Sequence, residues 1–287
     1  MAEGPTAPTT ETVAASARAG EPDRYLAALL APPAARDGLL ALAAFSAELG
    51  RIGQLVTREP MMGEIRLQWW RDALRLGDSG ERTGNPVADA LREAMLRHAL
   101  PAPLLLGMID ARASDLQPEP FSSEDALAAY LTDSEAAPFT LAAHVLGEPA
   151  PARPDLEAAG TAAGHAYGLV RLLLGLPHAL ARGSSPLPRE LLVRAGIADL
   201  ASEADPAKIA ALMGDLHAEV RRHFEAARQH VANLPRPTRV AFLPLALVRP
   251  YLRALERPVH NPLRDLAEIA PLQRVWRIGR AHWLGRM

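Results

Sequence analysis

The side chains that could do chemistry do not fall into a spacing that defines an active site by itself. None of the nine histidines belongs to an HExxH motif, the helical spacing that binds zinc. Glu219 and His223 lie four residues apart, but the run also holds Arg221 and Arg222, so we interpret it as a solvent-exposed helix face. His165 lies in a glycine-rich segment, where a hydrogen-bonded core histidine is the simpler interpretation.

Nucleophilic and phosphate-binding motifs give no stronger signal. Gly183-Ser184-Ser185 has no strand pattern before it, and a nucleophile elbow requires one. The sequence contains neither a Walker phosphate loop nor a dinucleotide-binding glycine fingerprint. Because it has no cysteine, it cannot form a disulfide, a thiolate metal site or a cysteine nucleophile, which fits a reducing compartment.

Composition favours a helical protein. Hydrophobic residues make up 49% of the 287 residues, enough for a sizeable core, and aromatics only 5%, so Leu and Ala must provide most of the packing. The formal net charge of -2 gives no basic footprint for nucleic acid. No apolar stretch reaches the roughly 18 residues that a membrane span needs.

Periodicity and punctuation by Pro and Gly predict helices and no sustained strands. Residues 1–20 lack an apolar block and are predicted to be a disordered tail, and residues 21–287 one all-α domain. The helices are expected at about 23–31, 34–57, 61–76, 86–98, 101–117, 124–146, 154–176, 206–233, 239–255 and 262–285.

Two helices carry unusual patterns. In residues 61–74, Leu67, Trp70 and Leu74 form an apolar stripe, which predicts a buried Trp70, while Trp69 points about 100° away toward a second helix or a cavity wall. In residues 154–176, glycines at positions 160, 164 and 168 leave a bare groove. The groove suits close helix packing, with a lipid-lined cavity as the alternative.

The C-terminal helix is predicted to have two contrasting sides. One side holds Leu272, Val275, Trp276, Gly279 and Trp283, and the other holds Arg274, Arg277 and Arg280. Tryptophans opposite arginines are typical of a helix at a membrane interface or docked on a membrane-bound complex. The alternative is that both tryptophans close the protein's own core. We expect a cytoplasmic protein that can associate with the inner face of the membrane.

Over nearly all of residues 23–255 the sequence resembles the squalene/phytoene synthase family. The resemblance rests on residues 42–46 (LAAFS), Trp70-Arg71, 85–87 (NPV), 106–116 (LGMIDARASDL), 125–131 and the glycine-rich helix with the loop after it. Two strings, 44–52 (AFSAELGRI) and 59–74 (EPMMGEIRLQWWRDAL), are most similar to the branch that includes a mitochondrial complex I assembly factor. The family-motif helix contains Glu64, Arg66, Trp69, Trp70, Arg71 and Asp72.

The resemblance implies a helical bundle around a central cavity, and it also shows a departure from the family. Active members carry two aspartate-rich motifs on facing helices, which hold Mg²⁺ on a prenyl diphosphate. Here the corresponding positions are occupied by Gly50, Arg51 and Gln54 on one helix and by Gly175 and Ala179 on the other. None is a carboxylate, so we expect no metal site.

We expect charged pairs to replace the metal network in this cavity. Arg171 lies one turn before Gly175, and a cavity arginine needs an acidic partner; Glu48, Glu64 and Asp72 are the candidates. Glu48 is also expected to pair with Arg51, three residues later. The expected degenerate cavity consists of Glu48, Gly50, Arg51, Gln54, Arg171, Gly175 and Ala179.

These features favour a non-catalytic assembly or interaction factor without a cofactor, with respiratory complex I as the candidate target. Its partner would be a protein or a membrane-bound complex, and no nucleic acid is expected. One alternative is an active head-to-head prenyltransferase that binds Mg²⁺ through relocated ligands. The other is a module that binds an isoprenoid lipid.

Overall fold

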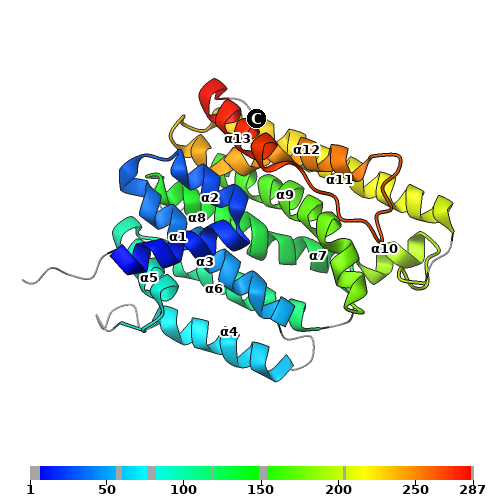
Figure 1. Ribbon diagram of the computed structural model, residues 1–287, viewed down its shortest axis with the longest axis horizontal. Coiled ribbons are helices and arrows are strands. Elements are labelled where there is room, and N and C mark those ends of the chain that lie inside the picture. Colours follow the sequence, from blue (N-terminus) through cyan, green and yellow to red (C-terminus); the bar gives the residue numbers. More distant parts are fainter. Residues whose placement is uncertain are drawn as a thin grey trace, which may run out of the picture.

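A computed structural model describes residues 7–55, 60–75, 82–117, 119, 121–148, 154–202 and 205–285, and the regular structure in these ranges is entirely helical, as predicted. The helices pack into a bundle in which the long helix α9 runs through the centre (Figure 1). In chain order they are α1 (Ala7–Gly20), α2 (Pro22–Leu29), α3 (Pro33–Leu55), α4 (Pro60–Arg75), α5 (Pro86–His98), α6 (Ala102–Ala111), the 3-10 helix η2 (Arg112–Leu116), α7 (Glu124–Leu131), the π-helical turn η3 (Thr132–Ala136), α8 (Ala137–Val145), α9 (Pro154–Ala181), α10 (Arg189–Arg194), α11 (Pro206–Asn233), the 3-10 helix η4 (Thr238–Leu247), α12 (Val248–Leu255) and α13 (Pro271–Leu284).

Local sequence signals set many of the helix starts. The Asn85 side chain accepts hydrogen bonds from the backbone amides of Val87 and Ala88 at 2.9 and 3.1 Å, and thereby caps α5. Ser123 caps α7 and Asp205 caps α11 in the same way. Proline at the first helical turn accompanies several of these starts, since its missing amide costs nothing there.

The structure corrects the prediction of a disordered tail for residues 7–20. These residues form α1, whose Val13 and Ala17 are buried. Gly20 at the end of α1 approaches α3 so closely that a Cβ there would lie 2.5 Å from the Cβ of Ala47. Burial against α3 therefore supplies the stability that composition alone did not indicate. Residues 1–6 of the predicted tail lie outside the described residues.

Three smaller differences concern the later part of the chain. The last helix begins at Pro271 rather than Pro262, and α10 was not predicted. The segment 124–146, expected as one helix, is divided into α7, the π-helical turn η3 and α8. Such turns often mark functional positions, and η3 contributes Glu135 to the site described below.

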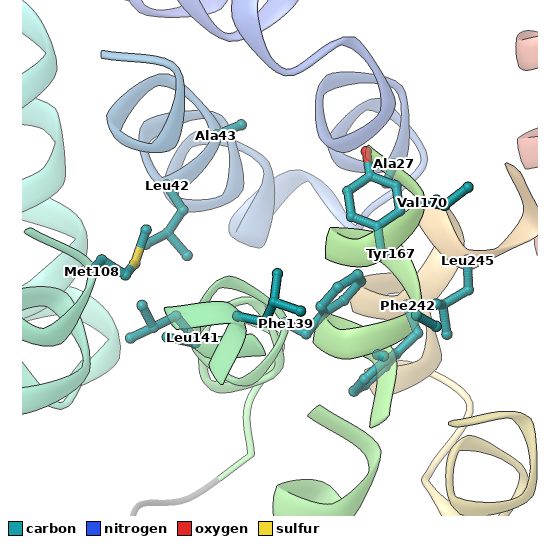
Figure 2. Packing of buried hydrophobic residues seen from close by; sticks show 14 of the residues in the cluster. Ala27, Leu42, Ala43, Met108, Phe139, Leu141, Tyr167, Val170, Phe242 and Leu245 are labelled. Carbon is teal, nitrogen blue, oxygen red and sulfur yellow. The ribbon is translucent and has the colours of Figure 1, made fainter. Parts of the chain in front are cut away.

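The core joins the central helices through aromatic contacts (Figure 2). Phe139 of α8 stacks on Phe242 of η4 with ring centroids 5.5 Å apart, and it meets Tyr167 of α9 edge-on at 5.8 Å. Trp70 of α4 is buried as predicted and packs against Phe45 of α3, 5.0 Å away. These rings join α4 to α3, and α8 to both α9 and η4.

The glycine-rich face of α9 is a helix-packing surface. A Cβ on Gly164 would lie 2.4 Å from the backbone of Ala136, and one on Gly160 would lie 2.5 Å from the Thr140 hydroxyl. A Cβ on Gly168 would lie 2.7 Å from Leu131. The three glycines thus let α9 approach η3 and its neighbours closely, and Gly168 also borders the cleft described below.

Candidate functional site: a cleft between α3 and α9

A cleft of about 700 Å³ opens between α3 and α9 and is closed on its other sides by the end of α1, η2, η3 and the loop after α9. Its size matches that of a small-molecule site. Polar and charged side chains form much of its wall: Glu21, Arg51, Arg112, Asp115, Tyr130, Glu135, Arg171 and Arg182.

The structure brings most of the predicted cavity residues together. Gly50, Arg51, Arg171, Gly175 and Ala179 all line the cleft, although they come from helices more than 100 residues apart. The predicted position Glu48 is not among the lining residues. Its carboxylate accepts hydrogen bonds from Arg51 at 2.7 Å, as predicted, and from Ser16 at 2.8 Å. The side chain of Gln54 lies outside the described part of the chain.

Two arginines and two glutamates form an ion-pair network on the floor of the cleft. Arg171 of α9 lies 2.9 Å from Glu21 and 3.4 Å from Glu135. Arg24 of α2 pairs with the same two carboxylates, at 2.7 and 2.9 Å. Both guanidiniums also lie over the Tyr167 ring, within 5.4 Å of its centroid. The network joins the start of α2, the turn η3 and the helix α9.

A second cluster continues the network toward η2. Arg112 donates hydrogen bonds to Asp115 at 3.1 Å and to the Tyr130 hydroxyl at 2.7 Å. The Tyr130 hydroxyl in turn donates to Asp115 at 2.8 Å. Arg112 also lies 3.9 Å from Glu135, and this contact connects the two clusters.

The ion pairs on the floor of the cleft favour the ionised forms of Glu135 and Arg171. Burial opposes ionisation of Glu135, but Arg171, Arg24 and Arg112 outweigh it and hold its pKa at about 2. Burial likewise opposes the charge on Arg171, and Glu21 and Glu135 outweigh it, so the pKa of Arg171 rises above its usual range. Burial raises the pKa of Tyr130, whose hydroxyl therefore remains a hydrogen-bond donor.

Arg171 faces the cleft and has acidic partners, as predicted. The three residues predicted as partners, Glu48, Glu64 and Asp72, are not the ones that bind it. Glu64 and Asp72 lie on the exposed side of α4, and Glu48 binds Arg51 instead. The partners are Glu21 and Glu135, which are buried with side chains only 4% and 9% exposed. A sequence signal for Glu135 existed, because it is an acidic residue among the apolar positions Leu131 and Phe139.

The cleft does not fit the Mg²⁺ cluster that the fold family implies. Gly50 and Gly175 face open space, since a Cβ on either would meet nothing within 4 Å. The side chain at position 179 is a methyl group and Arg51 is cationic, so none of these four residues is a ligand for a hard cation. Across the ranges that the structure describes, no group of three or more His, Cys, Asp or Glu side chains could hold a metal ion.

The family-motif helix α4 contributes no residue to the cleft wall. Trp69 is 40% exposed and contacts Trp70 edge-on, 5.1 Å away. Arg71 pairs with Asp110 of α6 at 2.7 Å, and Gln68 donates to Asp72 at 2.8 Å. The charged face of α4, including Glu64 and Arg66, is exposed. This helix therefore supports α3 and α6 from outside the cleft.

The remaining histidine candidates belong to the contact between α9 and α11. His223 lies 3.2 Å from Glu219, and its ring is 5.0 Å from that of His165. His165 also contacts the Thr132 hydroxyl at 3.0 Å. His165 makes a hydrogen bond, as the sequence predicted, but it is half-buried and does not belong to the core, and burial lowers the pKa of its imidazole.

The C-terminal helix α13 exposes its tryptophans. Trp276 is 67% exposed and Trp283 is 90% exposed, so neither closes the core. The side of α13 that contacts the body carries Ile278, Ala281 and Arg274. Arg274, predicted to lie with the other arginines, instead forms an ion pair with buried Asp23 at 2.8 Å. Among the described residues no helix has the length and apolarity to cross a membrane.

Solved structures with the same arrangement of helices define the class of fold. A dehydrosqualene synthase bound to a ligand aligns with a TM-score of 0.79 over 96% of each chain, at 18% identity. The squalene synthase HpnC of Alicyclobacillus acidocaldarius aligns with a TM-score of 0.74 over 87% of this chain and 93% of its own, at 19% identity. The molecule therefore has a squalene synthase-like fold.

The chain belongs to the squalene/phytoene synthase family, whose signature matches residues 17–278. Among curated proteins it is similar to "NADH dehydrogenase (ubiquinone) complex I, assembly factor 6" of Rattus norvegicus, with 27% identity over 87% of this chain and 76% of the relative. The Homo sapiens protein of the same name is 25% identical over 86% of this chain and 75% of its own. A Drosophila melanogaster homologue is 27% identical over 82% of this chain and 72% of its own.

Proposed function

We propose that this chain is a non-catalytic member of the family and acts as an assembly or interaction factor for respiratory complex I. The observation that carries this proposal is the wall of the cleft, which Gly50, Arg51, Gly175 and Ala179 line, at positions where the resemblance to active family members leads us to expect metal-binding carboxylates. Similarity to proteins named as complex I assembly factors supports the choice of target.

The acidic residues that line the cleft, apart from exposed Glu119, are already bound to other side chains, which supports the same proposal. Glu21 and Glu135 bind Arg24 and Arg171, and Asp115 binds Arg112 and Tyr130. A transferase with relocated ligands would have to break these buried ion pairs before it could bind Mg²⁺. Loss of a metal cluster removes several kcal/mol of charge stabilisation, on the order of 10³-fold or more in rate.

A lipid-binding module is the second candidate, and the cleft volume of about 700 Å³ favours it. The open space beside Gly175 provides a way to separate the two candidates, since a Cβ there would meet nothing within 4 Å and a larger side chain would occupy part of the cleft. If the protein functions through its surface, filling the cleft should not affect it.

The test is deletion of the gene in its own host, followed by native electrophoresis of complex I and assay of NADH:ubiquinone oxidoreductase activity. We expect loss of assembled complex I and rescue by both the wild type and a Gly175→Leu variant. A stable Gly175→Leu protein that fails to rescue would identify the cleft ligand as the functional element. Normal complex I in the deletion strain would contradict the proposed target.

A further inference from the structure

Helix α13 presents a row of exposed apolar side chains that no other part of the described chain covers. Its members are Leu272, Val275, Trp276 and Trp283, with exposed fractions of 83%, 52%, 67% and 90%, and we call them, with Gly279 between them, the α13 stripe. The two tryptophans are seven residues apart, so they lie on one side of the helix, about 10 Å apart along its axis.

The opposite side of α13 is firmly attached to the body. Arg274 pairs with Asp23 at 2.8 Å and donates a hydrogen bond to the Tyr251 hydroxyl at 3.3 Å. Asp23 is itself held by the hydroxyls of Tyr167 at 2.9 Å and Tyr251 at 2.7 Å. This attachment fixes the orientation of α13, so the α13 stripe points outward as a preformed surface.

The charges beside the α13 stripe have one sign. The helix contains three arginines and a histidine and no acidic residue. Arg274 is neutralised by Asp23, whereas Arg277 and Arg280 have no hydrogen-bond or ion-pair partner in the described part of the chain. An apolar row with two tryptophans and free arginines complements a surface that is apolar inside and anionic at its boundary.

We propose that α13 is an interfacial helix that binds the protein to a bilayer containing anionic lipid. The tryptophan rings would enter the boundary between headgroups and acyl chains, and Arg277 and Arg280 would contact lipid phosphates. Helix α4, whose Met61, Met62, Ile65 and Trp69 are also exposed, lies at the opposite edge of the molecule and would face away from the lipid (Figure 1).

This inference deepens the proposed function, because it places an assembly factor at the membrane, but it can fail independently. Vesicle binding is measured on the purified full-length chain, without complex I. Absence of lipid binding would leave the role in assembly open, and a normal complex I in the deletion strain would leave lipid binding open.

The experiment is co-sedimentation with vesicles of phosphatidylcholine alone or of phosphatidylcholine mixed with phosphatidylglycerol. We expect binding to the mixed vesicles that weakens with salt, accompanied by a blue shift of tryptophan fluorescence. The double variant Trp276→Ser/Trp283→Ser should bind at least about 10-fold more weakly, since two large apolar contacts are lost. The double variant Arg277→Gln/Arg280→Gln should lose about 10-fold for mixed vesicles and little for neutral ones.

The matched control is Trp69→Ser on α4, which removes an exposed tryptophan from the other edge and should leave binding unchanged. Circular dichroism checks that each variant keeps its helices. Wild-type protein that fails to bind mixed vesicles would overturn the proposal, and so would undiminished binding by the folded Trp276→Ser/Trp283→Ser variant. If this variant also abolishes complex I assembly while the wild type binds no vesicles, the α13 stripe contacts a protein instead.

Discussion

Nη1 of Arg171 lies 2.9 Å from Oε1 of Glu21, so a cation in the middle of α9 is bound to an anion at the start of α2. The same nitrogen is 3.4 Å from Glu135. In the family that this fold belongs to, α3 and α9 are the helices expected to share bound Mg²⁺. Here protein side chains neutralise one another on the floor of the cleft, and these ion pairs join α9 to α2 and η3.

The first prediction concerns Glu135. Replacing it by Gln keeps its shape but leaves Arg24 and Arg171 with one carboxylate between them, since both now pair with Glu135 as well as Glu21. Removal of one partner from a buried ion pair costs about 3–5 kcal/mol. We expect the free energy of unfolding in urea to fall by that amount. An equally stable Glu135→Gln variant would show that the network does not hold the bundle together.

The second prediction concerns acid. The pKa of Glu135 is about 2 in the folded protein, against a usual value of 4.5. On acidification the unfolded chain therefore takes up this proton first, so the stabilisation is complete above about pH 5 and is lost as the pH falls toward 2. Urea titrations from pH 6 to 3 should show falling stability, with a shallower fall in Glu135→Gln. Identical pH profiles would assign acid denaturation to other groups.

The third prediction uses two glycines of the same helix. A Cβ at Gly164 would lie 2.4 Å from the backbone of Ala136, whereas a Cβ at Gly175 would meet nothing within 4 Å. Gly164→Ala should therefore destabilise the protein by several kcal/mol or prevent folding. Gly175→Ala should raise the melting temperature slightly, because alanine favours a helix over glycine by about 1 kcal/mol. A melting temperature for Gly164→Ala at or above that of the wild type would contradict the packing described for α9.

The fourth prediction concerns the attachment of α13. Asp23→Asn removes the negative charge that faces Arg274 while preserving the side-chain shape, and we expect a loss of about 1–3 kcal/mol. The loss should be local, with faster amide hydrogen exchange in residues 274–284 than in α9. Uniformly faster exchange throughout the chain would instead show that Asp23 stabilises the whole bundle and not the attachment of α13 alone.

Sequence reasoning recovered the parts of the fold that depend on local signals. The helices expected from about residues 86, 124 and 206 begin at Pro86, Glu124 and Pro206, where the side chains of Asn85, Ser123 and Asp205 cap them. Family positions also predicted correctly that Gly50 and Gly175 would face one cleft, although no local pattern relates residues so far apart.

Long-range pairings could not be predicted in the same way. Glu135 and Arg171 are 36 residues apart, and their contact depends on the π-helical turn η3 and on the close approach of α9. Helix α1 was missed because its Ala- and Thr-rich sequence resembles a solvated tail, whereas burial of Val13 and Ala17 against α3 stabilises it. In both cases tertiary packing decided the outcome.

If the cleft does not support metal-dependent prenyl transfer, as we propose, the purified chain should form no product from prenyl diphosphates. The purified chain is incubated with farnesyl or geranylgeranyl diphosphate and Mg²⁺, and both the lipid products and released pyrophosphate are measured. We predict no turnover above the protein-free background, with or without a chelator. Formation of a condensed C30 or C40 product that a chelator abolishes would contradict the account.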